Sequence, residues 1–189
     1  MNRVIFFGIV LAAAFSASPA LAGPLNAVGV MSATPDGADW DYTIKLTNTG
    51  TVDIGTFWYS WMPGQGYLPS APISMTPPTG WTDMQTNGPP PGDGFSIQAV
   101  AGAGFALAPG SSLLFEFKSA DSPETLAGVS TIHPGHPIGT SFLYGGAPFS
   151  DAGQQIIVTS VPEPSTLVLG AVGAVGLFVY ARARRKAKA

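Results

Sequence analysis

The chain has 189 residues, and its 24 Gly and 18 Pro together outnumber its 8 basic and 11 acidic residues. An apolar share of 46% and 20 aromatic residues (4 Trp, 5 Tyr and 11 Phe) are unlike a disordered chain, so we expect a folded, loop-rich protein. The chain contains no Cys, which excludes a disulfide scaffold, a Cys-ligated zinc site, a Cys nucleophile and a thiolate-held iron–sulfur centre.

Charge divides the chain into zones. Residues 23–160 contain ten acidic residues and two lysines, a net charge of -8, whereas residues 161–189 have a net charge of +4. A body this acidic repels nucleic acid and anionic lipid headgroups, so we expect neither as a direct partner.

The N-terminus has the pattern of a secretory signal peptide. Arg3 precedes an apolar stretch over 4–15, and small residues follow at Ala20 and Ala22. The apolar stretch is shorter than the ~20 residues that a spanning helix needs, which disfavours an uncleaved anchor. We therefore expect residues 1–22 to direct the chain to the secretion translocon, with signal peptidase cutting before Gly23.

Residues 40–46 predict a half-buried strand, because their apolar side chains alternate with polar ones and share one face: Trp40, Tyr42, Ile44 and Leu46. The tripeptide at 48–50 (Asn-Thr-Gly) predicts a hairpin turn, with 51–61 returning as the next strand. Around the start of the strand predicted at 40–46, three carboxylates could form a calcium loop: Asp36, Asp39 and Asp41. The Pro-Asp-Gly sequence at 35–37 explains Asp36 as a turn residue without an ion.

The aromatic run at 57–61 allows two orientations. A strand in simple register with Val52 and Ile54 would expose Phe57, Tyr59 and Trp61 as a row on which sugar rings or a partner could stack. A bulge at Gly55 would reverse the facing and bury the same three rings, and this is the orientation we favour.

Residues 62–94 contain eight prolines and six glycines and no convincing strand. A loop of this length is either functional or ordered against the body, where Tyr67, Leu68 and Trp81 could hold it. The three prolines at 89–91 predict a stiff polyproline segment.

Further strands are predicted after this loop. The Pro-Gly turn at 109–110 precedes alternating residues over 113–118, and weaker candidates are 25–31, 95–100, 127–132, 140–144 and 154–159. Seven or eight short strands predict an all-β antiparallel β-sandwich, immunoglobulin-like or fibronectin-like, over residues 23–160.

Residues 23–160 contain none of the common catalytic sequence motifs. No spacing identifies two of their ten carboxylates as a catalytic pair. His133 and His136 lie in a Pro-rich turn, and two histidines without a nearby third ligand more often form a solvated loop than a metal site. We expect no catalytic residues, no metal and no cofactor.

The C-terminus has three parts: a Pro-Glu-Pro segment, an uncharged stretch and a basic end. The two prolines predict extended backbone over 161–164, and Ser165 is a natural N-cap for a transmembrane helix over 166–181. That helix is short for the hydrocarbon core, which suits a temporary anchor. The basic tail over 182–189 should stay in the cytoplasm, which places the body beyond the inner membrane; its topogenic residues are Arg182, Arg184, Arg185 and Lys186.

Residues 161–189 resemble the PEP-CTERM sorting signal of Gram-negative bacteria. The sorting motif consists of Val161, Pro162, Glu163, Pro164, Ser165 and Thr166. The resemblance implies recognition by an exosortase, a multi-spanning membrane protease or transpeptidase that cuts near this motif, so that catalysis would belong to the partner.

These features favour an exported, non-enzymatic protein. We expect it to be anchored transiently in the inner membrane with its body in the periplasm, and then processed for the cell surface or the extracellular matrix. The alternative is a carbohydrate-binding module that binds extracellular polysaccharide through exposed aromatic rings.

Overall fold

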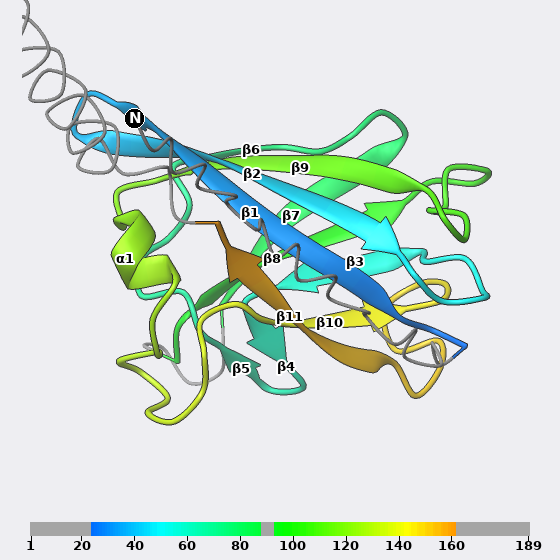
Figure 1. Ribbon diagram of the computed structural model, residues 1–189. Coiled ribbons are helices and arrows are strands. Elements are labelled where there is room, and N and C mark those ends of the chain that lie inside the picture. The colour runs from blue at the N-terminus through cyan, green and yellow to red at the C-terminus, as the bar shows by residue number, and fades with distance from the viewer. Residues whose placement is uncertain (1–23, 88–92, 162–189) are drawn as a thin grey trace, which may run out of the picture.

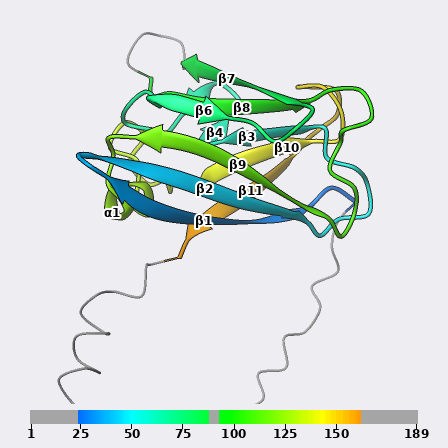
Figure 2. The same ribbon diagram turned by 90° about the horizontal axis from the view of Figure 1, so that it is seen from above.

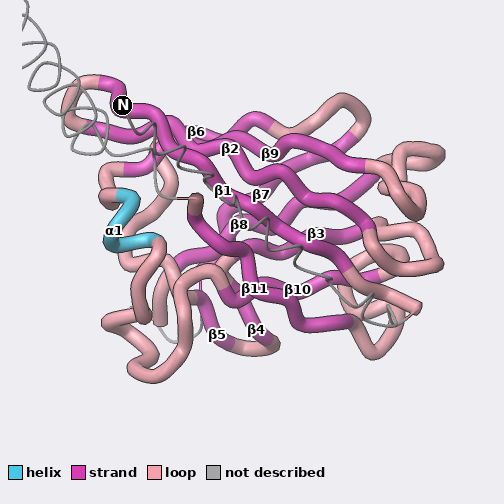
Figure 3. The backbone as a smooth tube through the Cα atoms, in the orientation of Figure 1, coloured by secondary structure: helices cyan, strands magenta, loops and turns pink. Residues whose placement is uncertain are grey.

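The computed structural model describes residues 24–87 and 93–161 (Figure 1). The predicted signal peptide, its cleavage site at Ala20, Ala22 and Gly23, the prolines at 89–91, and the sorting segment from Pro162 onward lie outside the described residues. Within the described part, the chain forms an all-β fold with one four-residue helix, α1 (Pro123–Leu126), at one end (Figure 3).

Nine strands form one sheet in the order β6-β9-β2-β1-β11-β10-β3-β8-β7. Their bounds are β1 (Ala27–Asp36), β2 (Asp39–Asn48), β3 (Thr56–Tyr59), β6 (Ser74–Thr76), β7 (Trp81–Asn87), β8 (Phe95–Ala101), β9 (Ser112–Ser119), β10 (Thr140–Tyr144) and β11 (Gln154–Ser160). A separate hairpin consists of β4 (Trp61–Met62) and β5 (Gln65–Gly66).

The sheet folds back on itself to make two layers (Figure 2). The first layer contains β6, β9, β2 and β1, the second contains β10, β3, β8 and β7, and β11 pairs with both. Aromatic contacts join the layers: the Phe57 and Phe115 ring centroids lie 5.0 Å apart, and those of Tyr59 and Phe117 lie 5.5 Å apart. The sandwich arrangement therefore has a continuous apolar core between its layers.

The strand predicted at 40–46 is confirmed as part of β2. Tyr42, Ile44 and Leu46 are at most 1% exposed, and Trp40 packs at the margin of the core. Each fully buried apolar side chain of this size contributes about 1.5–3 kcal/mol to stability.

The prediction of a purely antiparallel sheet is wrong, because β1 and β11 pair in parallel, with Gly29 opposite Val158 and Met31 opposite Ser160. The first and last strands of the body lie side by side, so the whole domain serves as the long connection that a parallel pair requires. A Cβ on Gly29 would lie 2.7 Å from Val158 Cγ2, so this close approach needs glycine.

The predicted hairpin at 48–50 is also wrong, because β2 pairs with β1 and β9, while β3 lies in the other layer. Fully buried Asn48 redirects the chain: its Nδ2 donates to Val52 O (2.9 Å) and Leu107 O (2.8 Å), and its Oδ1 accepts from Gly50 N (2.9 Å). These bonds hold a crossover between the layers, and of the strand predicted at 51–61 only β3 and the first residue of β4 form.

Two other strand predictions need correction. Residues 127–132 form no strand and contribute only a single bridge, between Val129 and Pro137. Segment 62–94, for which no strand was predicted, contains part of β4 and all of β5, β6 and β7. Its predicted anchors are confirmed, since Tyr67, Leu68 and Trp81 are all buried.

Replacing Asn48 with Ala tests the crossover. We expect Asn48→Ala to lower the free energy of unfolding by about 2–3 kcal/mol, because it removes three hydrogen bonds made by a fully buried side chain. Urea unfolding followed by Trp fluorescence measures the change. The control is Thr49→Ala at an exposed neighbour, and equal stability of the two variants would contradict this role.

Asp83 provides a second test. It lies on the same side of β7 as Trp81, and its Oδ1 is shielded from solvent without a hydrogen-bond partner. Burial raises the pKa of Asp83 from 3.8 to about 6. Between these pH values the folded chain therefore binds more protons than the unfolded chain, and this residue lowers stability as pH rises from 3.8 to 6.

We expect Asp83→Asn to remove that decline and to gain about 1–2 kcal/mol relative to the wild type between pH 4 and pH 7.5, a value reduced for the solvent screening of a half-buried group. Parallel urea titrations of the two proteins measure the difference. A difference that does not change with pH would contradict the assignment.

Candidate functional site

The body ends in a central strand of the sheet. β11 is paired on both sides, and its Ile156 and Val158 side chains are buried. The pairing continues one residue beyond the strand, where Val161 N donates to Met31 O at 2.9 Å. The first residue of the predicted sorting motif, Val161, is thus held against β1 by its backbone, while its side chain is 53% exposed.

The body begins directly after the predicted signal-peptide cleavage site. Pro24 O accepts hydrogen bonds from Thr51 N and Val52 N, both at 3.0 Å. Because β1 and β11 are parallel, Pro24 precedes the start of β1, whereas Val161 follows the end of β11 and lies next to Met31, in the middle of β1. Pro24 and Val161 are therefore separated along the direction of the two strands.

A set of aromatic side chains covers the outer face of the second layer. We define this outer aromatic cluster as Trp58, Trp61, Phe142, Tyr144 and Phe149. The Trp58 and Trp61 rings stack with centroids 3.6 Å apart and planes 2° apart. Trp58 Nε1 donates to Ser96 Oγ at 3.0 Å, so the polar atom of this buried ring is satisfied.

The structure shows which way the aromatic side chains of residues 57–61 face. Phe57 and Tyr59 point into the main core, while Trp61 joins the outer aromatic cluster, and all three are at most 6% exposed. The exposed row for ligand stacking is therefore contradicted, and burial is confirmed. The backbone of Gly55 lies so close to Gly146 that a Cβ would be 2.8 Å from Gly146 Cα.

Two residues with left-handed backbone belong to this region, and sequence reasoning missed both. Ser60 has φ 57° and Phe149 has φ 63°; they are the only non-Gly residues with positive φ within 24–87 and 93–161. Ser60 turns the chain between Tyr59 and Trp61, which sends their rings to opposite faces. Phe149 is 64% exposed and contacts both Trp rings edge-on at 5.8 Å. No period or turn motif around either residue indicates this conformation.

The carboxylates considered for calcium are instead paired with an ammonium group. The Pro-Asp-Gly sequence forms the β1–β2 turn, in which Gly37 has φ 67°. Lys118 Nζ forms ion pairs with Asp36 and, at 3.5 Å, with Asp41. The hydrogen bond to Asp36 raises the pKa of Lys118, so this cation stays in place between the two carboxylates. The geometry thus favours the turn interpretation.

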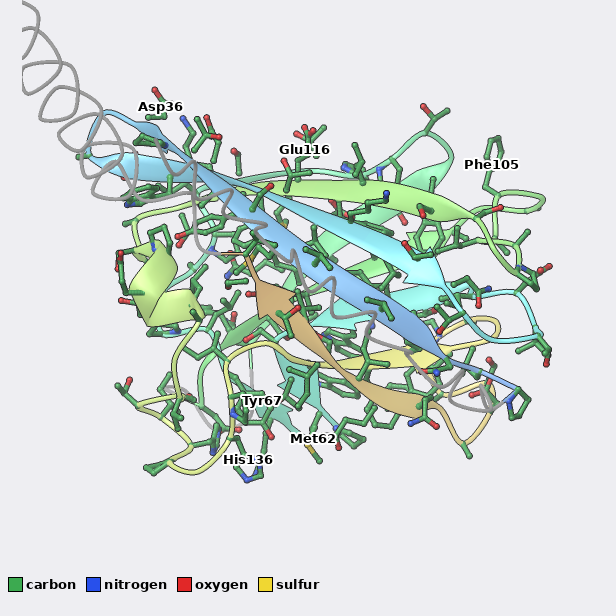
Figure 4. All side chains as sticks on the ribbon, viewed as in Figure 1. Asp36, Met62, Tyr67, Phe105, Glu116 and His136 are labelled. Carbon is green, nitrogen blue, oxygen red and sulfur yellow. The ribbon has the colours of Figure 1, made fainter. Side chains whose placement is uncertain are left out.

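The two histidines pack on Tyr67. His136 lies beside Tyr67 (Figure 4) and stacks on its ring with centroids 5.5 Å apart, and His133 contacts the same ring edge-on at 5.3 Å. His133 Nε2 lies 2.7 Å from Asp93 Oδ1. No group of three metal-ligating side chains occurs in the described part of the chain. His133 is half-buried and residues 134–137 are exposed, so the turn is largely solvated, as expected from sequence, while both imidazole rings pack against Tyr67.

Similarity to known proteins is strongest in the C-terminal segment. Residues 160–186 match the family model described as the PEP-CTERM protein-sorting motif. No curated protein matches the chain. Among described residues, no helix is long and apolar enough to span a membrane.

Solved structures show only distant similarity. Two structures of a GH20 exo-β-N-acetylglucosaminidase from Vibrio harveyi match with 11% and 10% identity and a TM-score of 0.37. Each alignment covers 72% of this chain but only 18% of the enzyme chain. An uncharacterized Nocardia farcinica protein with an immunoglobulin-like fold matches with 13% identity and a TM-score of 0.36, over 69% of this chain and 98% of its own.

The stacking of Trp58 on Trp61 can be tested by spectroscopy. Two indole rings this close couple their electronic transitions, so the circular dichroism spectrum should contain an exciton couplet that Trp61→Phe abolishes, with a loss of about 1 kcal/mol in stability. Trp81→Phe is the matched control, because Trp81 packs on Phe115 in the main core. A couplet that persists in Trp61→Phe would contradict the stacked geometry.

Proposed function

Because the chain carries a PEP-CTERM protein-sorting motif over residues 160–186, we propose that it is an exported, non-enzymatic protein that an exosortase processes for the cell surface or the extracellular matrix. The motif match is the observation on which this proposal rests. In the proposed route, the translocon and signal peptidase act first, the C-terminal helix then anchors the chain in the inner membrane, and the exosortase cuts near Pro162 and Pro164.

The geometry of the body supports this route at both ends. Pro24, close behind the proposed signal cleavage site, is already tied to the body, because its carbonyl oxygen accepts hydrogen bonds from Thr51 N and Val52 N. At the other end, β11 is paired on both sides, so a cut beyond Val161 leaves every strand of the sheet intact. Both processing steps are compatible with an already folded body.

The chemistry of the body supports a non-enzymatic role. Its conspicuous side-chain groups have structural partners: Asp36 and Asp41 pair with Lys118, and both histidines pack on Tyr67. The two-layer arrangement also supports a sandwich of the immunoglobulin or fibronectin type. The runner-up, a carbohydrate-binding module using Phe57, Tyr59 and Trp61, loses its basis because these rings are buried.

The proline pair of the motif tests the sorting route. We expect the double variant Pro162→Ala with Pro164→Ala to accumulate as a cell-bound precursor with its tail intact, because helix-compatible residues would remove the extended segment that a protease cleft needs. Intact-mass spectrometry of the membrane and secreted fractions reports both ends of the chain.

The matched control is Pro134→Ala, which changes an exposed proline of the body. It should be processed like the wild type. If the double variant were released with the same C-terminus as the wild type, the proposed sorting route would be wrong.

A further inference from the structure

β7 is a long and open edge of the sheet. The strand order ends at β7, which pairs with β8 from Trp81 opposite Ala101 to Asn87 opposite Phe95. The other edge strand, β6, has three residues, whereas β7 has seven. An exposed edge of this length is a template for pairing with another strand.

The phase of the β7–β8 ladder identifies which backbone groups are free. Gly102 N donates to Gly80 O at 2.7 Å, which makes that pair a hydrogen-bonded one, and hydrogen-bonded pairs alternate along an antiparallel ladder. Phe95 agrees with this phase, since its N–H and C=O are bonded to Leu68 on the far side of β8. On β7, the backbone groups of Asp83, Gln85 and Asn87 consequently point away from β8.

The side chains of β7 are suited to pairing in an acidic protein. On the outer face, Thr82, Met84 and Thr86 are uncharged, and Met84 is 54% exposed. The only charged residue of the strand is Asp83, which lies on the inner side with Trp81. Bodies that repel one another elsewhere through a net charge of -8 can therefore meet along an uncharged strand.

Self-pairing also supplies a partner for Asp83. In an antiparallel pair of two β7 strands centred on Gln85, Asp83 of one copy lies opposite Asn87 of the other, on the same face. Within one chain, Gln85 Nε2 donates to Asn87 Oδ1 at 3.2 Å, and the Asn87 amide nitrogen remains a donor. That donor matches the shielded Asp83 Oδ1, which accepts no hydrogen bond in the single chain. This complementarity favours a second copy over an unrelated strand.

We propose that β7 is a homotypic docking edge, at which a second copy of this chain adds antiparallel through the free backbone groups of Asp83, Gln85 and Asn87. Asp83 also limits the pairing, because an inward-pointing carboxylate on an edge strand must lose hydration when another strand covers it.

The groups packed around Asp83 make the pairing dependent on pH. Neither β8 (Phe95–Ala101) nor β5 (Gln65–Gly66) contains an ionisable side chain, and on β9 the nearest core contact is the Phe115 ring against Trp81. Burial alone raises the pKa of Asp83, so a protonated carboxyl is the form that a second strand covers most easily. We expect dimerisation to strengthen as pH falls below about 6.

The lack of native cysteine allows a direct test on the purified full-length chain in a mild detergent. In the proposed register, the two copies of position 85 form a hydrogen-bonded pair with Cα atoms about 5.5 Å apart, within the span of a disulfide. With a mild oxidant, Gln85→Cys should give at least about tenfold more disulfide-linked dimer than Leu114→Cys, which is also at an exposed position, on β9. Equal cross-linking of the two variants, or a cross-link in cells to a chain of different mass, would overturn the proposal.

Two further variants separate backbone pairing from side-chain effects. Gln85→Pro removes a free-edge N–H without removing a bond to β8, so it should abolish dimers in sedimentation equilibrium, whereas Gln85→Ala should retain them. Asp83→Asn should tighten dimerisation at pH 7.5 by up to about thirtyfold for each of the two carboxyls in the dimer, since each wild-type carboxyl must be protonated about 1.5 pH units above its pKa. Circular dichroism verifies that each variant is folded. A Gln85→Pro protein that dimerises as well as Gln85→Ala overturns the proposal.

Discussion

The parallel pairing of β1 with β11 is the constraint on which the rest of the structure depends. It joins the two ends of the body, and through the antiparallel pairing of β11 with β10 it links the two layers into one sheet. The close contact of Gly29 with Val158 leaves no room for a larger residue at the junction. Because both strands run the same way, this pair also separates Pro24 from Val161 along the strand direction.

Local patterns predicted the strands but not their partners. Alternation identified β2 because Tyr42, Ile44 and Leu46 need burial on one face whatever strand lies next to them. The Asn-Thr-Gly turn signal was misleading, because Asn48 uses its side chain to hold a crossover and not a hairpin. Which strands pair depends on contacts between residues far apart in sequence, as Asn48 with Leu107 illustrates, and no local motif contains that information.

The candidate sites show the same contrast between features that a local sequence pattern predicts and features that it does not. The sorting motif could be found from sequence because its function resides in a contiguous segment. The fate of Trp61 could not, because it depends on the left-handed backbone of Ser60, a conformation that no neighbouring residue indicates. A strand that continued in simple alternation would have put Trp61 beside Tyr59 in the main core. The left-handed Ser60 instead sends Trp61 to the outer aromatic cluster, where its ring is also buried.

The inner position of Asp83 is explained by the strand in which it lies. A half-buried carboxyl with a raised pKa lowers stability near neutral pH, and an apolar residue beside Trp81 would pack better there. On a central strand, a half-buried carboxyl would lower stability and would have no compensating effect. On β7 it hinders indiscriminate strand addition, because any added strand must cover the charge or neutralise it. A neighbour that offers an amide donor at the right register reduces that penalty, and Asn87 of a second copy meets the requirement because the antiparallel arrangement is symmetric about Gln85. The loss of stability in the single chain is therefore linked to selectivity at the edge.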